Sequence, residues 1–289
     1  MHFIKAKSIL SARNGMNLYR GCQHGCIYCD ARSTCYGMDH AFEDIAVKGN
    51  GPELLEAALR SKRRPCMIGT GAMSDPYMPL EEELKLTRKS LKIIEKYGFG
   101  ATVLTKSDRI LQDLDILQRI NNRTKAVVQM TLTTMDEDLC RILEPNVSTT
   151  RQRIAALKAF QQARIPTVVW MCPILPFLND TEENICGIVD ACADTGVWGI
   201  VHFGMGLTLR DGNRAYFYEK LDRHFPGLKE QYIRTYGNAY EIPSPRADRL
   251  EQLFRECCDK YGICRDNDRI FAYLSSLPER ENMQLSLFD

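Results

Sequence analysis

Short apolar segments alternate with longer amphipathic segments through most of this chain. Short apolar runs are typical of buried parallel strands, and longer amphipathic runs are typical of helices. Parallel strands need crossovers, so the alternation predicts one parallel sheet with right-handed helical connections. The expected strands are 16–20, 66–70, 101–105, 126–132, 167–174 and 199–203, and the expected helices are 52–62, 80–97, 110–121, 150–164 and 181–195.

Six strand–helix repeats are too few to close an eight-stranded barrel. We therefore expect an α/β fold, a partial (β/α)6 barrel over residues 1–203. Beyond it, we expect residues 204–274 to form a helical C-terminal extension and residues 275–289 to form a flexible tail. Two helix ends are marked by capping residues: Gly98 after the second helix, and Asp180 before the fifth.

The composition excludes several classes of protein. Among 289 residues the net charge is only +1, which gives no overall attraction to nucleic acid. The first residues lack a secretory signal, and no apolar run is long enough to cross a bilayer. Twelve Cys in a chain of this length indicate reduced thiols rather than a disulfide scaffold. We expect a cytoplasmic protein with no membrane partner.

Cys22, Cys26 and Cys29 stand at C-x3-C-x2-C spacing, in a loop whose glycines allow tight wrapping. Three thiolates so close together are suited to one small metal centre. They supply one ligand fewer than structural zinc or a ferredoxin-type cluster requires. A [4Fe–4S] cluster held by these three Cys would keep one iron open to a small molecule. The alternative is a zinc site completed by His24, Cys35 or His40.

The cysteine loop resembles the cluster loop of the radical S-adenosylmethionine (SAM) superfamily. The resemblance implies that the open iron binds the amino and carboxylate groups of SAM. It also implies a fold, a partial barrel with the cluster loop after the first strand. The expected chemistry is reductive cleavage of SAM to a 5′-deoxyadenosyl radical, with electrons from a flavodoxin or ferredoxin.

Later segments resemble one branch of that superfamily, the spore photoproduct lyase family, often called DNA repair photolyases. They follow successive strands in order. These segments are Gly69 to Tyr77, Thr105 to Ser107, Thr131 to Thr134, Leu143 to Pro145 with Arg153, and Met171 to Pro176. The resemblance runs from about Met16 to Phe203 and implies a substrate in DNA.

The resemblance implies roles for four polar residues in binding SAM. Lys106 would supply a cation for the SAM carboxylate, and Ser74 with Asp75 would supply polar partners. Thr131 would hydrogen-bond the ribose. The alternatives are a solvated strand end for Lys106 and simple strand preference for Thr131.

Two further positions bear on the family assignment. The spore enzyme has a hydrogen-donor Cys two residues before its Ser-Asp pair, where this chain has Ala72. Cys172, at the end of the fifth strand, is the expected substitute, with a small buried hydrophobe as the alternative. Glu144 with Arg153 is interpreted as a structural ion pair rather than a ligand pair.

The last residues, Gln284-Leu285-Ser286-Leu287-Phe288, resemble the peptide by which bacterial repair factors bind the DNA sliding clamp. Two Leu and one Phe on a polar tether are suited to a groove on a partner. The alternative is a tail folded onto its own domain.

Together these features predict a radical SAM enzyme that acts on DNA in lesion repair. A radical SAM enzyme for RNA, a peptide or a small metabolite is one alternative. A non-catalytic metal-binding adaptor of the clamp is another.

Overall fold

The computed structural model describes residues 1–278. Its centre is a six-stranded parallel sheet in the order β2-β5-β6-β7-β8-β9. The order follows the sequence, as a stepwise (β/α) winding requires. The strands are β2 (Gly15–Met16), β5 (Met67–Thr70), β6 (Gly100–Thr105), β7 (Ala126–Thr131), β8 (Thr167–Trp170) and β9 (Gly199–Val201). The predicted partial barrel is confirmed.

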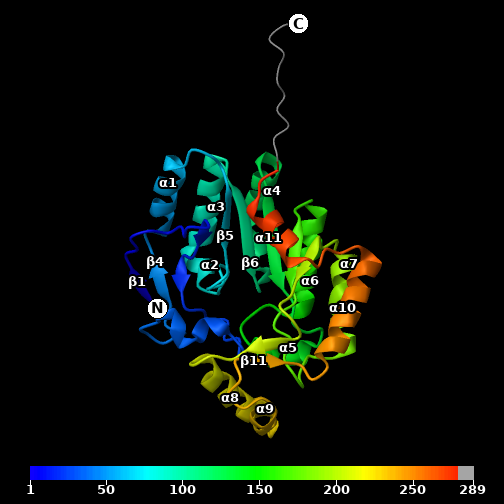
Figure 1. The fold of residues 1–289 in the computed structure, drawn as a ribbon. Coiled ribbons are helices and arrows are strands. Elements are labelled where there is room, and N and C mark those ends of the chain that lie inside the picture. Colours follow the sequence, from blue (N-terminus) through cyan, green and yellow to red (C-terminus); the bar gives the residue numbers. More distant parts are fainter. Residues whose placement is uncertain (279–289) are drawn as a thin grey trace, which may run out of the picture.

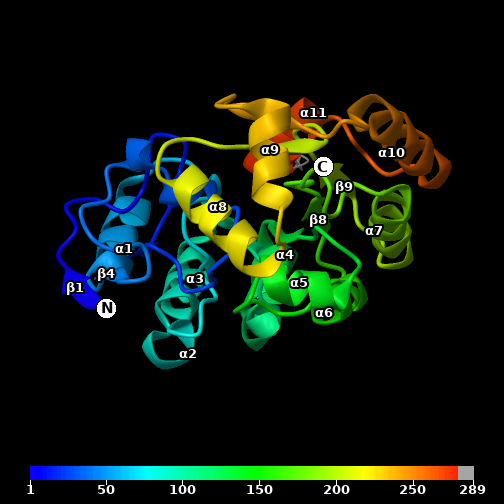
Figure 2. The same cartoon turned by 90° about the horizontal axis from the view of Figure 1, so that it is seen from below.

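Helices cover the outer face of this sheet in an arc that Figure 2 shows from one end. Their apolar residues join those of the strands in one large core. These helices are α1 (Gly51–Ser61), α2 (Glu81–Leu84), α3 (Leu86–Tyr97), α4 (Leu114–Arg123), α5 (Glu137–Leu143), α6 (Thr150–Gln162) and α7 (Glu182–Asp194). Short 3-10 helices are η1 (Asp30–Arg32), η2 (Thr34–Tyr36) and η3 (Asp108–Asp113).

A small sheet in the order β1-β4-β3 flanks the barrel near the N-terminus. It consists of β1 (His2–Ile4), β3 (Tyr19–Arg20) and β4 (Ala46–Lys48). The segment 16–20, expected as one strand, is thus divided between two sheets. The division places the cysteine loop, which starts just after β3, beside the end of the barrel.

The last third of the described chain adds elements in three places. An antiparallel pair, β10 with β11, crosses the end of the barrel, and α8 packs against α9 beside it. Helix α10 packs outside α7, whereas α11 contacts β5 and β9. The elements are β10 (Gly206–Thr208), α8 (Asn213–His224), α9 (Leu228–Tyr236), β11 (Glu241–Pro243), α10 (Ala247–Tyr261) and α11 (Asn267–Ser275).

Helix α11 closes the inside of the barrel. Ile270 and Leu274 form a small core with inward-facing residues of four strands: Met67, Val127, Val168 and Val201. In Figure 1 this helix lies across the open face of the sheet. Within residues 1–278, α11 thus fills the lumen at one level, and a cavity lies toward the carboxyl ends of the strands.

Several local expectations need correction. The helix expected over 80–97 is broken at Lys85, which has a left-handed φ of 52°. The strand expected over 167–174 ends at Trp170. Thr181, not Asp180, caps α7 by accepting from the backbone of Asn184.

Gly98 ends α3 in the left-handed conformation, as expected. No helix within residues 1–278 combines the length and apolar character that crossing a membrane would require.

Candidate functional site

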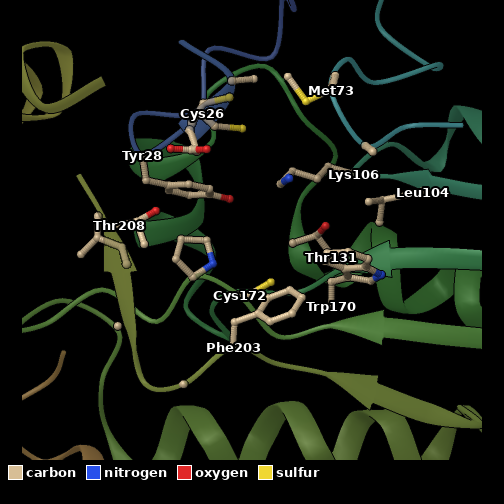
Figure 3. Close-up of a pocket in the computed structure, with 18 of the residues that line it drawn as sticks. Cys26, Tyr28, Met73, Leu104, Lys106, Thr131, Trp170, Cys172, Phe203 and Thr208 are labelled. Atoms are coloured by element: carbon tan, nitrogen blue, oxygen red, sulfur yellow. The ribbon is translucent and has the colours of Figure 1, made fainter. Parts of the chain in front are cut away.

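A cavity of about 730 Å³ lies at the carboxyl ends of the strands. Its size is within the range of small-molecule and cofactor sites. Residues from the cysteine loop, from five strand ends and from β10 and β11 line it, and Figure 3 shows part of this wall. The predicted site residues on the wall are Cys22, Cys26, Cys29, Ser74, Asp75, Lys106, Thr131 and Cys172. Ala72 also lines the cavity.

The end of α5 and the residues that follow it hold the cysteine loop in place. The Ile27 N–H donates to the Leu143 carbonyl at 2.9 Å, and the Asn146 N–H donates to the His24 carbonyl at 3.1 Å. Gly25 has φ +70°, and a Cβ there would lie 3.3 Å from Pro145. Residues 143–146 therefore form a cradle for the loop.

Ser74 and Asp75 use their side chains within the protein. The Ser74 hydroxyl donates to the Gly21 carbonyl at 2.7 Å. Asp75 accepts from the Thr105 hydroxyl at 2.7 Å and from the Lys106 N–H at 2.8 Å. Burial alone would raise the pKa of Asp75, but its neighbours, led by His24, lower it to about 2. The pair thus ties the cysteine loop to the ends of β5 and β6.

Lys106 brings a positive charge to the cavity beside the thiols. Burial by itself lowers the pKa of Lys106, but nearby Cys26 and Glu144 raise it above its usual value. The Lys106 side chain points into the cavity (Figure 3). Within residues 1–278 its ammonium group has no ion-pair partner, which leaves it free to meet an anionic ligand.

A buried ion pair lies behind the cysteine loop. Arg153 and Glu144 have fully buried side chains and bond to each other, and Tyr28 donates to the same carboxylate. Arg153 also donates to the Thr131 carbonyl at 2.8 Å. Burial opposes ionisation of Glu144, but Arg153 and Lys106 hold its pKa below the usual value. The pair therefore links the loop to the end of β7.

Cys172 and Ala72 lie on the same cavity, although they come from different strand ends. Burial raises the pKa of Cys172 to about 12, despite the opposing effect of Lys106. At neutral pH the side chain is therefore a thiol, with a hydrogen on sulfur. In Figure 3 it lies on the far side of the cavity from Cys26.

Comparison with known protein families shows which family has this arrangement of loop, sheet and cavity. The sequence profile of the Radical SAM superfamily matches residues 16–189, which include the cysteine loop, the last residue of β2 and the four barrel strands β5 to β8. The chain belongs to the radical SAM superfamily. Proteins of this superfamily use a [4Fe–4S] cluster and SAM, and both are cofactors of this chain.

Several proteins are similar to this radical SAM chain in sequence. An uncharacterized protein of Mycobacterium tuberculosis is 29% identical over 265 residues, covering 89% of this chain and 77% of the relative. An uncharacterized protein of Methanocaldococcus jannaschii is 33% identical over 184 residues, covering 63% of this chain and 68% of the relative.

Solved structures of spore photoproduct lyase share the fold. The lyase complexed with dinucleoside spore photoproduct matches with a TM-score of 0.63 and 16% identity, covering 84% of this chain and 72% of that one. A doubly substituted mutant of the lyase, with bound AdoMet and the same dinucleoside, gives a TM-score of 0.62 at the same identity and coverage.

The residues of this radical SAM protein fit a cluster by their donor chemistry and position. The three loop Cys share one cavity wall, and Lys106 opposes the effect of burial on the pKa of Cys26 and Cys29. No three His, Cys, Asp or Glu side chains in the described part already stand together as a metal site. The fit thus depends on three thiols in one loop beside a cation.

The residues considered for zinc have other contacts. His24 Nε2 lies 3.1 Å from Asp75 Oδ2, without the alignment of a hydrogen bond, and its Nδ1 lies 3.0 Å from the Asn146 carbonyl. Cys35 is exposed, near Arg210, and the His40 ring packs on His2. In the described part of the chain, none of the three side chains joins the loop thiols as a fourth zinc ligand.

Among the lining residues that were not predicted from the sequence of this radical SAM protein are two aromatic residues at strand ends. Trp170 ends β8 and Phe203 follows β9, and both border the cavity. Their position at strand ends was a usable signal, because inward-facing residues there meet a barrel's ligand. The clamp-like residues Gln284, Leu285, Leu287 and Phe288 lie outside the described residues.

Proposed function

We propose that this radical SAM enzyme acts on DNA, in repair of a base lesion. The observation that carries the proposal is one cavity that brings together the cysteine loop, Lys106 and Cys172. The fold shared with spore photoproduct lyase, a protein solved with a dinucleoside photoproduct, supports the choice of DNA. Cluster and SAM together supply the 5′-deoxyadenosyl radical, which abstracts a hydrogen atom from an unreactive C–H bond.

The chain's own residues would have separate tasks. Cys22, Cys26 and Cys29 would hold the cluster, and Lys106 would face the SAM carboxylate. Thr131, whose side chain borders the cavity, would bond the ribose. Ser74 and Asp75 would act less as direct ligands than by fixing the loop, because their side chains already have partners in the protein.

Cys172 would return a hydrogen atom to the substrate radical: its S–H bond breaks, a C–H bond forms, and the unpaired electron passes to the sulfur as a thiyl radical. A donor of hydrogen atoms must carry hydrogen on sulfur, and a pKa of about 12 keeps this thiol protonated. Ala72 borders the same cavity but has no group to donate. The sulfur would therefore act from the end of β8 rather than from the loop after β5.

The test of this function is anaerobic reconstitution followed by measurement of 5′-deoxyadenosine, with and without ultraviolet-irradiated DNA. We expect cleavage of SAM that rises with damaged DNA and a change in the lesion content. Replacing Cys22, Cys26 and Cys29 by Ala should abolish both. Cleavage of SAM with no effect on any DNA lesion would refute the DNA substrate, and cleavage by the triple variant would refute the cluster assignment.

A matched pair of variants tests Cys172. Cys172→Ala should leave SAM cleavage intact and divert the DNA products, because the substrate radical would lose its hydrogen donor. Cys66→Ala, at a partly buried thiol outside the cavity wall, is the control. An unchanged product spectrum in Cys172→Ala would remove this residue from the mechanism.

A further inference from the structure

Three aromatic rings gather where β8, β9 and α11 meet the cavity. Trp170 and Phe203 have ring centroids 5.8 Å apart, edge to face. Phe271 of α11 stacks on Phe203 at 6.3 Å, with the ring planes only 17° apart. Trp170 and Phe203 line the cavity, whereas Phe271 supports them from the side of α11.

The Trp170 ring is held in one orientation by a chain of hydrogen bonds across three strands. Its Nε1–H donates to Gln129 Oε1 at 2.8 Å, and Gln129 Nε2 donates to the Thr102 hydroxyl at 2.8 Å. Because an indole has only this one polar group, the rest of its surface is left for apolar contacts. Gln129 is thus a positioning residue for this ring.

Phe203 is unusual for a residue beside a cavity, because 62% of it is exposed. An exposed aromatic ring held by two other rings loses little conformational freedom when a ligand covers it. Figure 3 places Phe203 and Trp170 next to Cys172, away from Cys26. The cavity therefore has a polar end with the thiols and Lys106, and an aromatic end at its opening.

We infer that Trp170 and Phe203 form a stacking wall for a nucleobase turned out of a DNA strand, which it presents to Cys172. The inference rests on the proposed function and adds how its substrate is recognised. Aromatic side chains bind bases through their ring faces, with little dependence on sequence. Enzymes that act on a base extrude it into a pocket between aromatic and apolar side chains. A net charge of +1 gives the protein little overall attraction to the phosphates of DNA. Stacking on the wall would supply binding energy that does not depend on this attraction.

The experiment measures anisotropy of a labelled oligothymidine with the anaerobic holoenzyme in the presence of SAM. Phe203→Ala should weaken binding about 5- to 150-fold, the range for loss of one base–aromatic stack. Phe203→Tyr, which keeps the ring, should bind as the wild type does. Phe3→Ala is the matched control, because Phe3 is 61% exposed but lies outside the cavity wall.

A second ligand isolates the ring contact. An oligothymidine with abasic sites should bind weakly to the wild type and show no dependence on Phe203. Equal affinity of wild type and Phe203→Ala for the intact oligonucleotide would overturn the wall while leaving a DNA substrate in place. An oligothymidine that binds neither protein, before or after ultraviolet irradiation, would instead overturn the DNA substrate itself. Loss of SAM affinity in Phe203→Ala, with DNA binding unchanged, would assign the wall to the adenine of SAM and overturn the inference.

Discussion

At the scale of single residues, charge inside the cavity decides what the site binds. Lys106 lies beside two loop thiols and the Glu144 carboxylate, and their charges raise its pKa although burial lowers it. The ammonium group is therefore charged at neutral pH. A fixed cation at the wall of a cofactor cavity favours an anionic group of the ligand.

Replacing Lys106 by Ala should weaken SAM binding about 10- to 100-fold, because a charge-assisted contact contributes about 1.5–3 kcal/mol. Iron content should stay as in the wild type. Equilibrium dialysis with labelled SAM measures the affinity. Lys96→Ala is the control, since this exposed ammonium pairs with Glu56 at 2.6 Å, outside the cavity wall. Unchanged SAM affinity in Lys106→Ala would show that the Lys106 ammonium group does not bind SAM.

The pair of Arg153 and Glu144 allows a sharper comparison. Arg153→Met should destabilise the protein by about 3–5 kcal/mol, because it leaves a buried carboxylate without its partner. Arg153→Met with Glu144→Gln should recover part of the loss. Chemical unfolding of the anaerobic protein measures both. The control is Arg119→Met, at an exposed pair with Glu95, where we expect about 0–1 kcal/mol. Equal losses in Arg153→Met and Arg119→Met would show that burial adds nothing to this pair.

At the scale of elements, the break between α2 and α3 shows what periodicity could not predict. Lys85 turns left-handed, so the first N–H groups of α3 need new partners. The Glu81 carboxylate accepts from the Thr87 N–H at 2.7 Å and from the Arg88 N–H at 3.3 Å. The break is stabilised by Glu81, a side chain of the preceding helix, and not by a Gly or Pro at the break itself. The amphipathic pattern therefore continues across the break, and periodicity alone does not reveal it.

Glu81 should also make the stability of the folded protein depend on pH. Burial raises the pKa of Glu81 to about 7, well above its unfolded value of about 4.3. The folded state binds this proton more tightly, so its contribution to stability is complete below the unfolded pKa and is lost as pH rises through about 7. Glu81→Gln, which imitates the neutral acid, should flatten the decline in unfolding free energy between about pH 5 and pH 8. Parallel pH profiles for the two proteins would show that Glu81 is not the titrating group.

Strand order, the outer helices and the lining residues of strand ends were predictable, because each follows from local periodicity and from parallel winding. Contacts between distant segments were not. Asp180 looked like a helix cap, but it accepts from Ser244 at 2.5 Å and leaves the cap to Thr181. The partners of Ser74 and Asp75 were missed for the same reason: a polar side chain in a sequence does not show whether a ligand or the protein's own backbone will satisfy it.

At the scale of the whole molecule, the segment beyond the described residues carries a separate hypothesis. A peptide of residues 281–289 should bind purified bacterial sliding clamp. Leu287→Ala with Phe288→Ala should cost several kcal/mol and abolish the complex, because such peptides bind through a few buried anchors. Isothermal titration measures the binding. SAM cleavage should be the same in the full chain and in the double variant.

Failure of that peptide to bind would remove the tail as a reason for placing the enzyme at DNA. A chain that ends at residue 278 then offers a complementary measurement. Reduced unfolding free energy of the shortened chain, with no clamp binding by the peptide, would favour a tail that folds onto its own domain.

The residues after the cysteine loop are held by a distant part of the chain. Arg32 lies between the rings of Phe42 and Tyr216, at 4.4 and 3.7 Å from their centroids. The Thr34 N–H donates to the Asp211 carbonyl at 3.1 Å. A Cβ on Gly212 would lie 2.9 Å from the Arg32 carbonyl, so the two segments touch without room for a side chain.

This contact has a consequence for how the protein is made. The thiols leave the ribosome early, whereas Asp211 and Tyr216 follow almost two hundred residues later. A nascent chain that stops after the last barrel strand would contain the 143–146 cradle, but the residues just after the loop would lack their contacts with Asp211 and Tyr216. We therefore expect chains that end before α8 to retain less iron and sulfide than the full chain, which iron and sulfide analysis of truncated variants measures.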